Sequence, residues 1–247
     1  MASHVLPRFD WKSLWPSWLR AGKTEIGTLI AVLLFAVFCL SFAHVADEMI
    51  EGDTRSFDEA VILSMRNADD RADPIGPPWF EEAVRDMTSL GSMTILVFIT
   101  LGVVGYLALS GAHGAALLVA GSVGSGIAVT EFLKETFARP RPDLVSHAAK
   151  VFSQSFPSGH ATLSAVTYLT LGALLARVQP NRVLKAYLLL VAILLTLLVG
   201  VSRVYLGVHW PTDVLAGWCF GAAWAIACWF CAVWLQRRGQ VEKRVHS

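Results

Sequence analysis

Charged residues are scarce in this chain, and the shortage excludes most soluble folds. Only 16% of the 247 residues are charged, whereas 55% are hydrophobic and the mean hydropathy is +0.54. This composition is too apolar for an ordinary soluble domain. The formal net charge of +1 provides no basic excess, so nothing in it points to nucleic acid as a partner.

Cysteine is also rare, and all four cysteines lie inside apolar runs (Cys39, Cys219, Cys228 and Cys231). Cys228 and Cys231 form a C-x-x-C pair, but no other ligand type lies near it in the sequence. We expect these side chains to be small buried hydrophobic groups rather than a metal or redox site.

Six apolar runs are long enough to cross a bilayer. They cover residues 26–45, 92–109, 115–133, 158–178, 184–201 and 214–235. Each should be helical because lipid leaves an open sheet edge without hydrogen-bond partners. We therefore predict an all-α fold, an integral membrane six-helix transmembrane bundle. The first run is too long and starts too late for a cleaved signal peptide, so it is expected to be an uncleaved anchor.

The flanking lysine and arginine residues predict the orientation. If all six spans are real, basic residues at 8–23, 177–185 and 237–244 fall on one side, which is the cytoplasm. The expected organisation is a Trp-rich cytoplasmic interfacial segment (1–24), a six-span domain (25–235) and a cytoplasmic tail (236–247). Pro16 should break or restart the helix of the first segment. The short chain without a large soluble domain suits a bacterial inner membrane, with both termini in the cytoplasm.

A long segment, 47–91, is expected on the opposite, periplasmic face. Its apolar positions Phe57, Ala60, Val61, Ser64 and Met65 fit one face of a short helix on the outer leaflet. A second short helix should run from residue 79 to 87. Plain surface packing and a role in admitting substrate are both compatible with this pattern.

Small residues indicate close helix contacts within the spans. They occur in the third span (Gly121, Ser122, Ser125 and Gly126) and in the sixth (Gly217 and Gly221). Packing inside one bundle explains these positions without a dimer, so the oligomeric state stays open.

The stretch 202–213 carries an arginine, a histidine and an aspartate between two apolar runs. Pro211 fits the first turn of a helix, which places His209 and Asp213 one turn apart. The aspartate could then accept the Nδ1–H of His209 and leave Nε2 as an oriented nucleophile or base. An interfacial histidine with a capping aspartate is the alternative.

Two further clusters lie at the same membrane face. The third span ends with Lys134 and a R-P-R-P segment that includes Arg141, which could equally be a snorkelling lysine and a stiff loop. The fourth span begins with Ser158, Gly159 and His160, where unpaired N–H groups at a helix start suit an anion. A capping serine with an incidental histidine is the alternative there. The connecting loop, 134–157, is longer than most structureless loops, which favours function.

Together the clusters predict a phosphate site. Lys134, Arg141 and Arg203 are cations without an acidic cluster beside them that could hold Mg²⁺ or Zn²⁺. Charged groups at a membrane face with no neutralising partner imply a bound anion, and arginine forks match phosphate oxygens. We predict no metal and no cofactor.

The three clusters resemble the signature motifs of the type 2 phosphatidic acid phosphatase (PAP2) superfamily. The matching patterns are K-x6-R-P at Lys134, P-S-G-H at residues 157–160 and S-R-x5-H-x3-D at residues 202–213. They occur complete and in order, and the resemblance covers roughly residues 86–220. The N-terminal Trp-rich segment lies outside it.

The resemblance implies a role for each residue. His209 would attack phosphorus with Asp213 orienting it, and His160 would protonate the leaving oxygen. Phosphate would be bound by the remaining motif residues (Lys134, Arg141, Ser158, Gly159 and Arg203). These roles agree with what the residues could do unaided, because phosphoryl transfer depends on positioning and on neutralising charge.

The resulting prediction is a metal-independent lipid phosphatase that forms a phosphohistidine. Phosphatidic acid, phosphatidylglycerophosphate, diacylglycerol diphosphate and undecaprenyl diphosphate are all candidate substrates, and the bilayer is the other partner. A phosphotransferase using the same phosphohistidine is the nearest rival. Haloperoxidases share the motifs but are soluble. A binder or transporter of phospholipid head groups is disfavoured, because binding alone needs no oriented nucleophile.

Overall fold

A computed structural model describes residues 17–144 and 154–238, and in these ranges the chain is helical with no strand. Segment 47–91, expected on the periplasmic face and called the outer-face segment below, carries two of the helices, α2 and α3. The elements are α1 (Ser17–Glu51), α2 (Arg55–Ser64), α3 (Pro78–Ser89), α4 (Met93–Leu109), α5 (His113–Phe137), α6 (Gly159–Ser164), the π-helical η2 (Ala165–Leu169), α7 (Thr170–Val178), α8 (Arg182–Tyr205) and α9 (Pro211–Arg237). Residues 1–16 of the predicted N-terminal segment and residues 239–247 of the predicted tail lie outside the described residues. Helix α1 begins at Ser17, the first described residue, and the expected helix break at position 16 lies outside the described residues.

All six predicted spans are helical. Within the described residues, five stretches are long and apolar enough to cross a membrane alone: Ile26–Glu51, His113–Phe137, Gly159–Arg177, Arg182–Tyr205 and Pro211–Gln236. The remaining span is α4, whose 17 residues reach about 25 Å at 1.5 Å per residue, short of the roughly 30 Å hydrocarbon core. Joined to α3, from which it is bent by 48°, it is long and apolar enough for a sixth crossing. The predicted all-α membrane bundle is confirmed.

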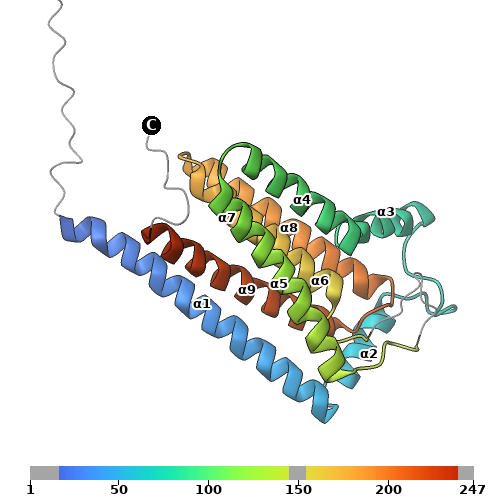
Figure 1. Ribbon diagram of the computed structural model, residues 1–247. Helices are drawn as coiled ribbons and strands as arrows, with labels where there is room; N and C mark the ends of the chain where they lie inside the picture. Colours follow the sequence, from blue (N-terminus) through green and yellow to red (C-terminus); the bar gives the residue numbers. More distant parts are fainter. Residues whose placement is uncertain (1–16, 145–153, 239–247) are drawn as a thin grey trace, which may run out of the picture.

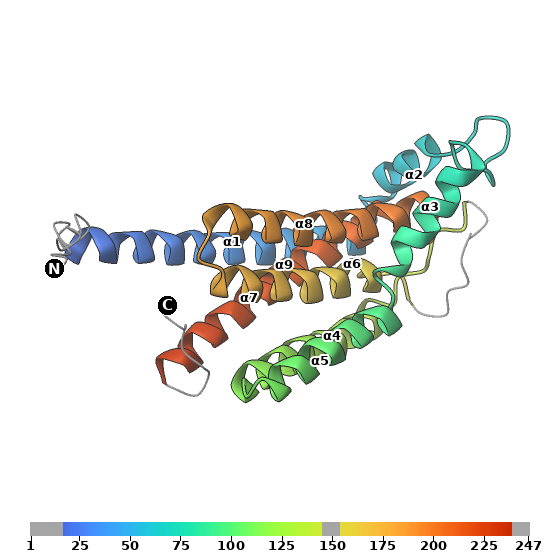
Figure 2. The same cartoon turned by 90° about the horizontal axis from the view of Figure 1, so that it is seen from above.

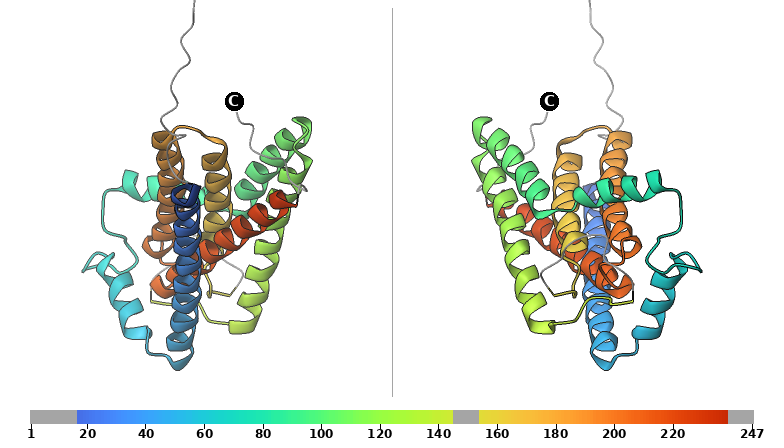
Figure 3. Two further views of the ribbon diagram at one scale, coloured as in Figure 1. Left: turned by 90° about the vertical axis from the view of Figure 1, so that its left-hand side faces the viewer. Right: turned by 90° about the vertical axis from the view of Figure 1, so that its right-hand side faces the viewer.

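The span formed by α6, η2 and α7 is the centre of the bundle. In the apolar 18-residue stretch of this span, 67% of the residues are buried inside the protein, whereas none is buried in the corresponding stretch of α1. Helix α1 lies along α9, and α4 pairs with α5 on another side of the centre (Figure 1, Figure 3). The beginning of α1, the end of α9 and the α7–α8 turn lie at one end of the bundle, and α2 and α3 lie at the other (Figure 2).

Glycines bring α9 against α6. A Cβ on Gly217 would lie 3.0 Å from the Ser158 carbonyl oxygen, and one on Gly221 would lie 2.8 Å from that of Thr162. Gly126 of α5 is similarly close, 2.8 Å, to Val166 of η2. Gly121 differs, because nothing lies within 4 Å of its Cβ position. The contacts of α9 hold the start of α6 beside its own start.

Helix α2 packs on this end of the bundle through a stripe that contains an acid. Asp58 and Ile62 are fully buried, and Val61 and Met65 pack on the hydrophobic cluster around Ile62. Phe57, from the predicted apolar face, is 57% exposed. The face of α2 that is buried in the protein thus shares Val61 and Met65 with the apolar face expected on the leaflet, and it also places the Asp58 carboxylate inside the protein.

Helix α3 and the loop before it are held against the end of α8. Val84 of α3 packs with Tyr205, and Arg66 donates to the Tyr205 carbonyl oxygen at 2.8 Å. The Tyr205 hydroxyl in turn donates to the Ile75 carbonyl oxygen at 2.8 Å. Both α2 and α3 thus adjoin the α8–α9 connection.

Candidate active site

His209 lies in the short connection between α8 and α9, where three local features place it. Gly207 has φ of 68°, a left-handed conformation that glycine adopts without steric cost, and it turns the chain after α8. Helix α9 begins at Pro211, as predicted, and its first turn carries Asp213. The His209 side chain is 1% exposed.

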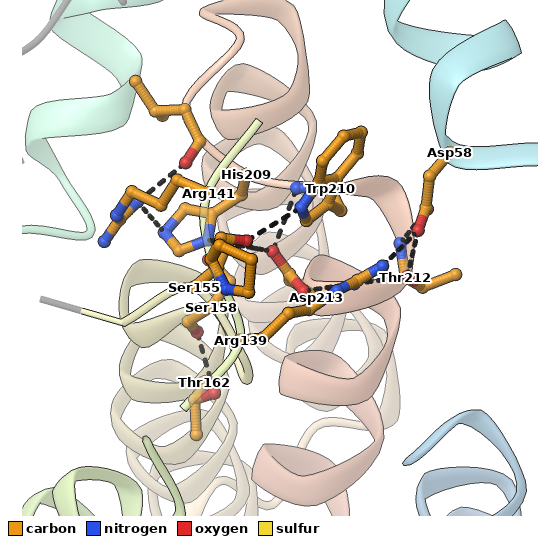
Figure 4. A network of polar contacts seen from close by, with 12 residues as sticks. Asp58, Arg139, Arg141, Ser155, Ser158, Thr162, His209, Trp210, Thr212 and Asp213 are labelled. Atoms are coloured by element: carbon orange, nitrogen blue, oxygen red, sulfur yellow. Dashed lines mark hydrogen bonds and ion pairs between the residues drawn. The ribbon is translucent and has the colours of Figure 1, made fainter. Parts of the chain in front are cut away.

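The contacts of the His209 ring determine which nitrogen carries the proton (Figure 4). Nη1 of Arg141 lies 3.0 Å from Nε2. Because a guanidinium can only donate, Nε2 accepts and the proton is on Nδ1. Nδ1 faces Ser155 Oγ at 3.3 Å and Asp213 Oδ2 at 3.4 Å. The Ser155 hydroxyl donates to Asp213 Oδ2, so it joins the ring and the carboxylate.

The electrostatic surroundings keep His209 neutral. Burial, and then the nearby charges of Arg141, Arg203 and Lys134, hold the pKa of His209 well below its ordinary value. A neutral ring with its proton on Nδ1 presents a lone pair at Nε2, which is the form a nucleophile requires.

Asp213 is held by two further donors as well as by Ser155. Its Oδ2 accepts the Trp210 N–H at 3.0 Å, which caps the start of α9. Its Oδ1 accepts from Arg139 Nη1 at 2.6 Å. The carboxylate is fully buried. This set of donors fixes the carboxylate in the orientation that faces His209.

Arg139 extends the network to α2 (Figure 4). Its Nη2 donates to Asp58 Oδ2 at 2.8 Å and to Thr54 Oγ1 at 3.2 Å. Asp58 also accepts the backbone N–H of Thr212 at 3.0 Å and its hydroxyl at 2.7 Å. One guanidinium therefore joins two buried carboxylates, one on α2 and one on α9.

The predicted phosphate-binding residues converge on the start of α6. A Cβ on Gly159 would lie 3.0 Å from Lys134 Nζ, so the ammonium group rests against this glycine. Lys134 also lies 3.7 Å from Glu131. The Ser158 hydroxyl is fully buried and has no hydrogen-bond partner among the described residues. It is a donor available to an incoming oxygen.

Arg203 reaches this region from the last turn of α8. It is 3% exposed, and its Nη1 donates to Thr88 Oγ1 of α3 at 3.1 Å. Its Nε has no partner within the described residues. His160, in the first turn of α6, interacts electrostatically with Arg203, His209 and Lys134. All the predicted site residues thus lie at one end of the bundle.

Several residues of this site were not predicted, among them Asp58, Thr88, Arg139 and Ser155. Arg139 stands two positions before Arg141, but its Arg-Pro pair also fits a stiff loop. Asp58 did leave a signal, because it lies on the same helical stripe as Val61, Ile62 and Met65. Among residues 17–144 and 154–238, no three His, Cys, Asp or Glu side chains are grouped to hold a metal ion.

Comparison with curated proteins shows relatives that act on lipid phosphates. The chain is 29% identical over 193 residues to a phosphatidylglycerophosphatase B of Bacillus subtilis, which covers 77% of this chain and 88% of the relative. It is 37% identical over 89 residues to an undecaprenyl-diphosphatase of Sulfolobus acidocaldarius, which covers 36% of this chain and 37% of that protein.

A solved structure supports the same relationship. The crystal structure of a transmembrane PAP2-type phosphatidylglycerolphosphate phosphatase from Bacillus subtilis superposes with a TM-score of 0.67 and 27% identity, over 84% of this chain and 98% of that one. Residues 115–237, which carry all three motifs, match the family model described as the PAP2 superfamily. With its helical membrane fold, its three motifs in one site and these relatives, the chain belongs to the PAP2 superfamily.

Proposed function

We propose that the protein is a metal-independent lipid phosphatase that works through a phosphohistidine at His209. The observation that carries this proposal is the orientation of His209, whose Nε2 is unprotonated and lies among the three cations Lys134, Arg141 and Arg203. A multiply charged phosphate would neutralise those cations and come within reach of Nε2. The names of the relatives support a lipid phosphate or diphosphate as substrate.

In the first step, the lone pair of Nε2 forms a bond to phosphorus as the bond from phosphorus to the lipid oxygen breaks. His160 gives its proton to the leaving oxygen. The imidazole of His209 gains positive charge, which Asp213 stabilises through Nδ1–H, directly or through Ser155. Arg141, Arg203, Lys134 and the Ser158 hydroxyl bind the phosphoryl oxygens.

In the second step, water attacks phosphorus and gives a proton to His160. The bond from phosphorus to Nε2 breaks, its electron pair returns to the nitrogen, and inorganic phosphate leaves. A phosphotransferase would follow the same first step and admit a lipid hydroxyl in place of water. A binder of phospholipid head groups would need neither the capped Asp213 nor the proton on Nδ1.

We further propose that the site faces the periplasm, across the inner membrane from both termini. The α7–α8 turn, the beginning of α1 and the end of α9 lie at the opposite end from α2 and α3 (Figure 2). Basic residues flank the spans at that opposite end, which is typical of the cytoplasmic side.

The deciding experiment is phosphate release by purified protein from a panel of lipid monophosphates and diphosphates, including short-chain phosphatidic acid. Release into water supports the phosphatase. Transfer of labelled phosphate to a second lipid supports the phosphotransferase, and no reaction on any substrate supports the binder. Activity should survive EDTA, whereas loss in EDTA that returns with Mg²⁺ would contradict the absence of a metal.

A further inference from the structure

A chain of buried charges leads from the His209 ring to the outer-face helix α2. Asp213 contacts the ring, Arg139 contacts Asp213, and Asp58 of α2 contacts Arg139. Both carboxylates are fully buried, and the Arg139 side chain is 11% exposed. Burial makes the chain of contacts electrostatically strong, because water screens it little.

We infer that Asp58 and Arg139 are positioning residues for the reaction, acting on His209 through Asp213. The inference rests on the proposed role of His209 as nucleophile. It gives α2, the short helix of the outer-face segment, a part in the chemistry in addition to its packing.

The geometry of Arg139 explains how α2 can orient Asp213. Nη1 donates to Asp213 and to Thr212 Oγ1 at 2.9 Å, while Nη2 donates to Asp58. A planar guanidinium with its two ends bonded to different carboxylates cannot rotate without breaking one pair. By binding Nη2, Asp58 keeps Nη1 of Arg139 directed at Asp213 Oδ1. Asp213 Oδ2 then remains directed at Ser155 and His209.

Asp58 also fixes the helix turn that carries Asp213. It accepts both the backbone N–H and the hydroxyl of Thr212, the neighbour of Asp213. A carboxylate at the first turn of a helix satisfies N–H groups that have no intrahelical partner. The Asp58 carboxylate therefore binds both Arg139, which contacts Asp213, and the first turn of α9, which carries Asp213.

The charge balance explains why the ionised form of Asp58 matters. The two carboxylates and one guanidinium have a net charge of −1, which is opposite to the charge that His209 gains as it bonds to phosphorus. With a neutral residue at position 58 the set has no net charge, and Arg139 is left to compete with His209 for Asp213. The transition state then loses stabilisation. Phosphate binding should change little, because the side-chain bonds of Asp58 within the described residues go to Arg139 and Thr212 and not to the proposed phosphate-binding residues.

The test compares Asp58→Asn with a matched control on the same helix, Glu59→Gln. Asparagine keeps the shape of Asp58 and an acceptor for Thr212. Glu59 instead pairs with Arg55 at 2.8 Å on the exposed side of α2. We expect Asp58→Asn to lower the rate of phosphohistidine formation by roughly 10- to 100-fold, by analogy with the loss seen when the outer partner of a metal-binding histidine is removed. KM should change by less than about twofold, and Glu59→Gln should match the wild type.

A double-mutant cycle separates positioning from a merely structural role. If Asp58 acts through Asp213, then Asp58→Asn combined with Asp213→Asn should be no slower than Asp213→Asn alone. Losses that multiply, or wild-type rates in Asp58→Asn, would overturn the inference. If Asp58→Asn does not fold, Arg139→Lys carries the same test, because lysine keeps the charge but cannot bridge both carboxylates.

A second readout needs no turnover. Vanadate bonds to an oriented Nε2, whereas inorganic phosphate is held by the cations alone, and binding of either is measured by protection against heat. Asp58→Asn should weaken vanadate binding and leave phosphate binding unchanged. Equal effects on both anions would overturn the inference. If the wild type binds vanadate but releases phosphate from no lipid, the proposed function is refuted. The comparison of vanadate with phosphate binding in Asp58→Asn still tests the inference about Asp58.

Discussion

Nη1 of Arg141 lies 3.0 Å from Nε2 of His209, and this Nε2 is the atom that we propose as the nucleophile. The same Nη1 donates to the Val208 carbonyl oxygen at 2.7 Å. For Nε2 to reach phosphorus, this guanidinium must move from the nitrogen to a phosphate oxygen, a bond that its planar fork favours. Phosphate binding would therefore engage the cation and expose the nucleophile in one movement.

Replacing the two central residues should have different consequences. His209→Ala should abolish phosphate release while the protein stays folded, because no other nucleophile takes its position. Asp213→Asn should keep a residual rate, lower by roughly 10²- to 10⁴-fold, since orientation is lost but Nε2 remains. Single-turnover trapping of labelled phosphohistidine measures both. Wild-type turnover in His209→Ala would refute the mechanism.

The low pKa of His209 should appear in the pH dependence. A depressed pKa means that Nε2 stays unprotonated at pH values below the ordinary histidine pKa of about 6.5. The acidic limb of kcat/KM, which reports the free enzyme, should therefore lie below that value. An aryl phosphate is a suitable substrate, because its second proton leaves at lower pH than that of an alkyl phosphate.

A variant gives the control for this profile. Arg141→Gln removes one of the cations that lower the pKa of His209, so its acidic limb should move toward higher pH. A wild-type limb near pH 6.5 that stays in place in Arg141→Gln would contradict the electrostatic account.

The role of His160 should depend on the leaving group. A lipid alkoxide resembles hydroxide, whose conjugate acid has a pKa of about 15.7, and it needs a proton in the transition state. General acid catalysis is worth roughly 10²- to 10⁴-fold. A diphosphate instead expels a phosphate whose second pKa is about 6, and this group leaves readily.

We therefore expect His160→Ala to slow phosphohistidine formation far more with phosphatidic acid than with a prenyl or diacylglycerol diphosphate. The first half-reaction must be measured, because His160 also activates water in the second. Equal losses on both substrates would show that His160 mainly binds phosphate.

The orientation in the membrane can be tested with single cysteines. Asp143, in the loop after α5, and Asn181, before α8, are both exposed. In intact cells, Asp143→Cys should react with an impermeant thiol reagent and Asn181→Cys should not, since the basic flanks place Asn181 in the cytoplasm. The unsubstituted chain, with its own four cysteines, gives the background. The reverse pattern would invert the proposed topology.

Local pattern alone determined much of this protein. The apolar runs became helices because a chain in lipid must satisfy its backbone groups internally, and this left one fold class. The exception in length is α4, which reaches the length of a span only together with α3. The pairing of His209 with Asp213 is local as well, because Pro211 starts a helix and residues four apart share a face. The three motifs indicated the family through residue types and spacing.

Only the tertiary structure decided which residues that are far apart in the sequence contact each other. Arg139 meets Asp58 across 81 residues, Ser155 meets His209 across 54, and Arg203 meets Thr88 across 115. Gly121 and Gly126 look equivalent in the sequence, yet Gly126 packs closely and Gly121 does not. Periodicity defines the faces of a helix, but which face meets which neighbour depends on how whole elements pack. That packing placed Asp58 inside the protein, within reach of Arg139.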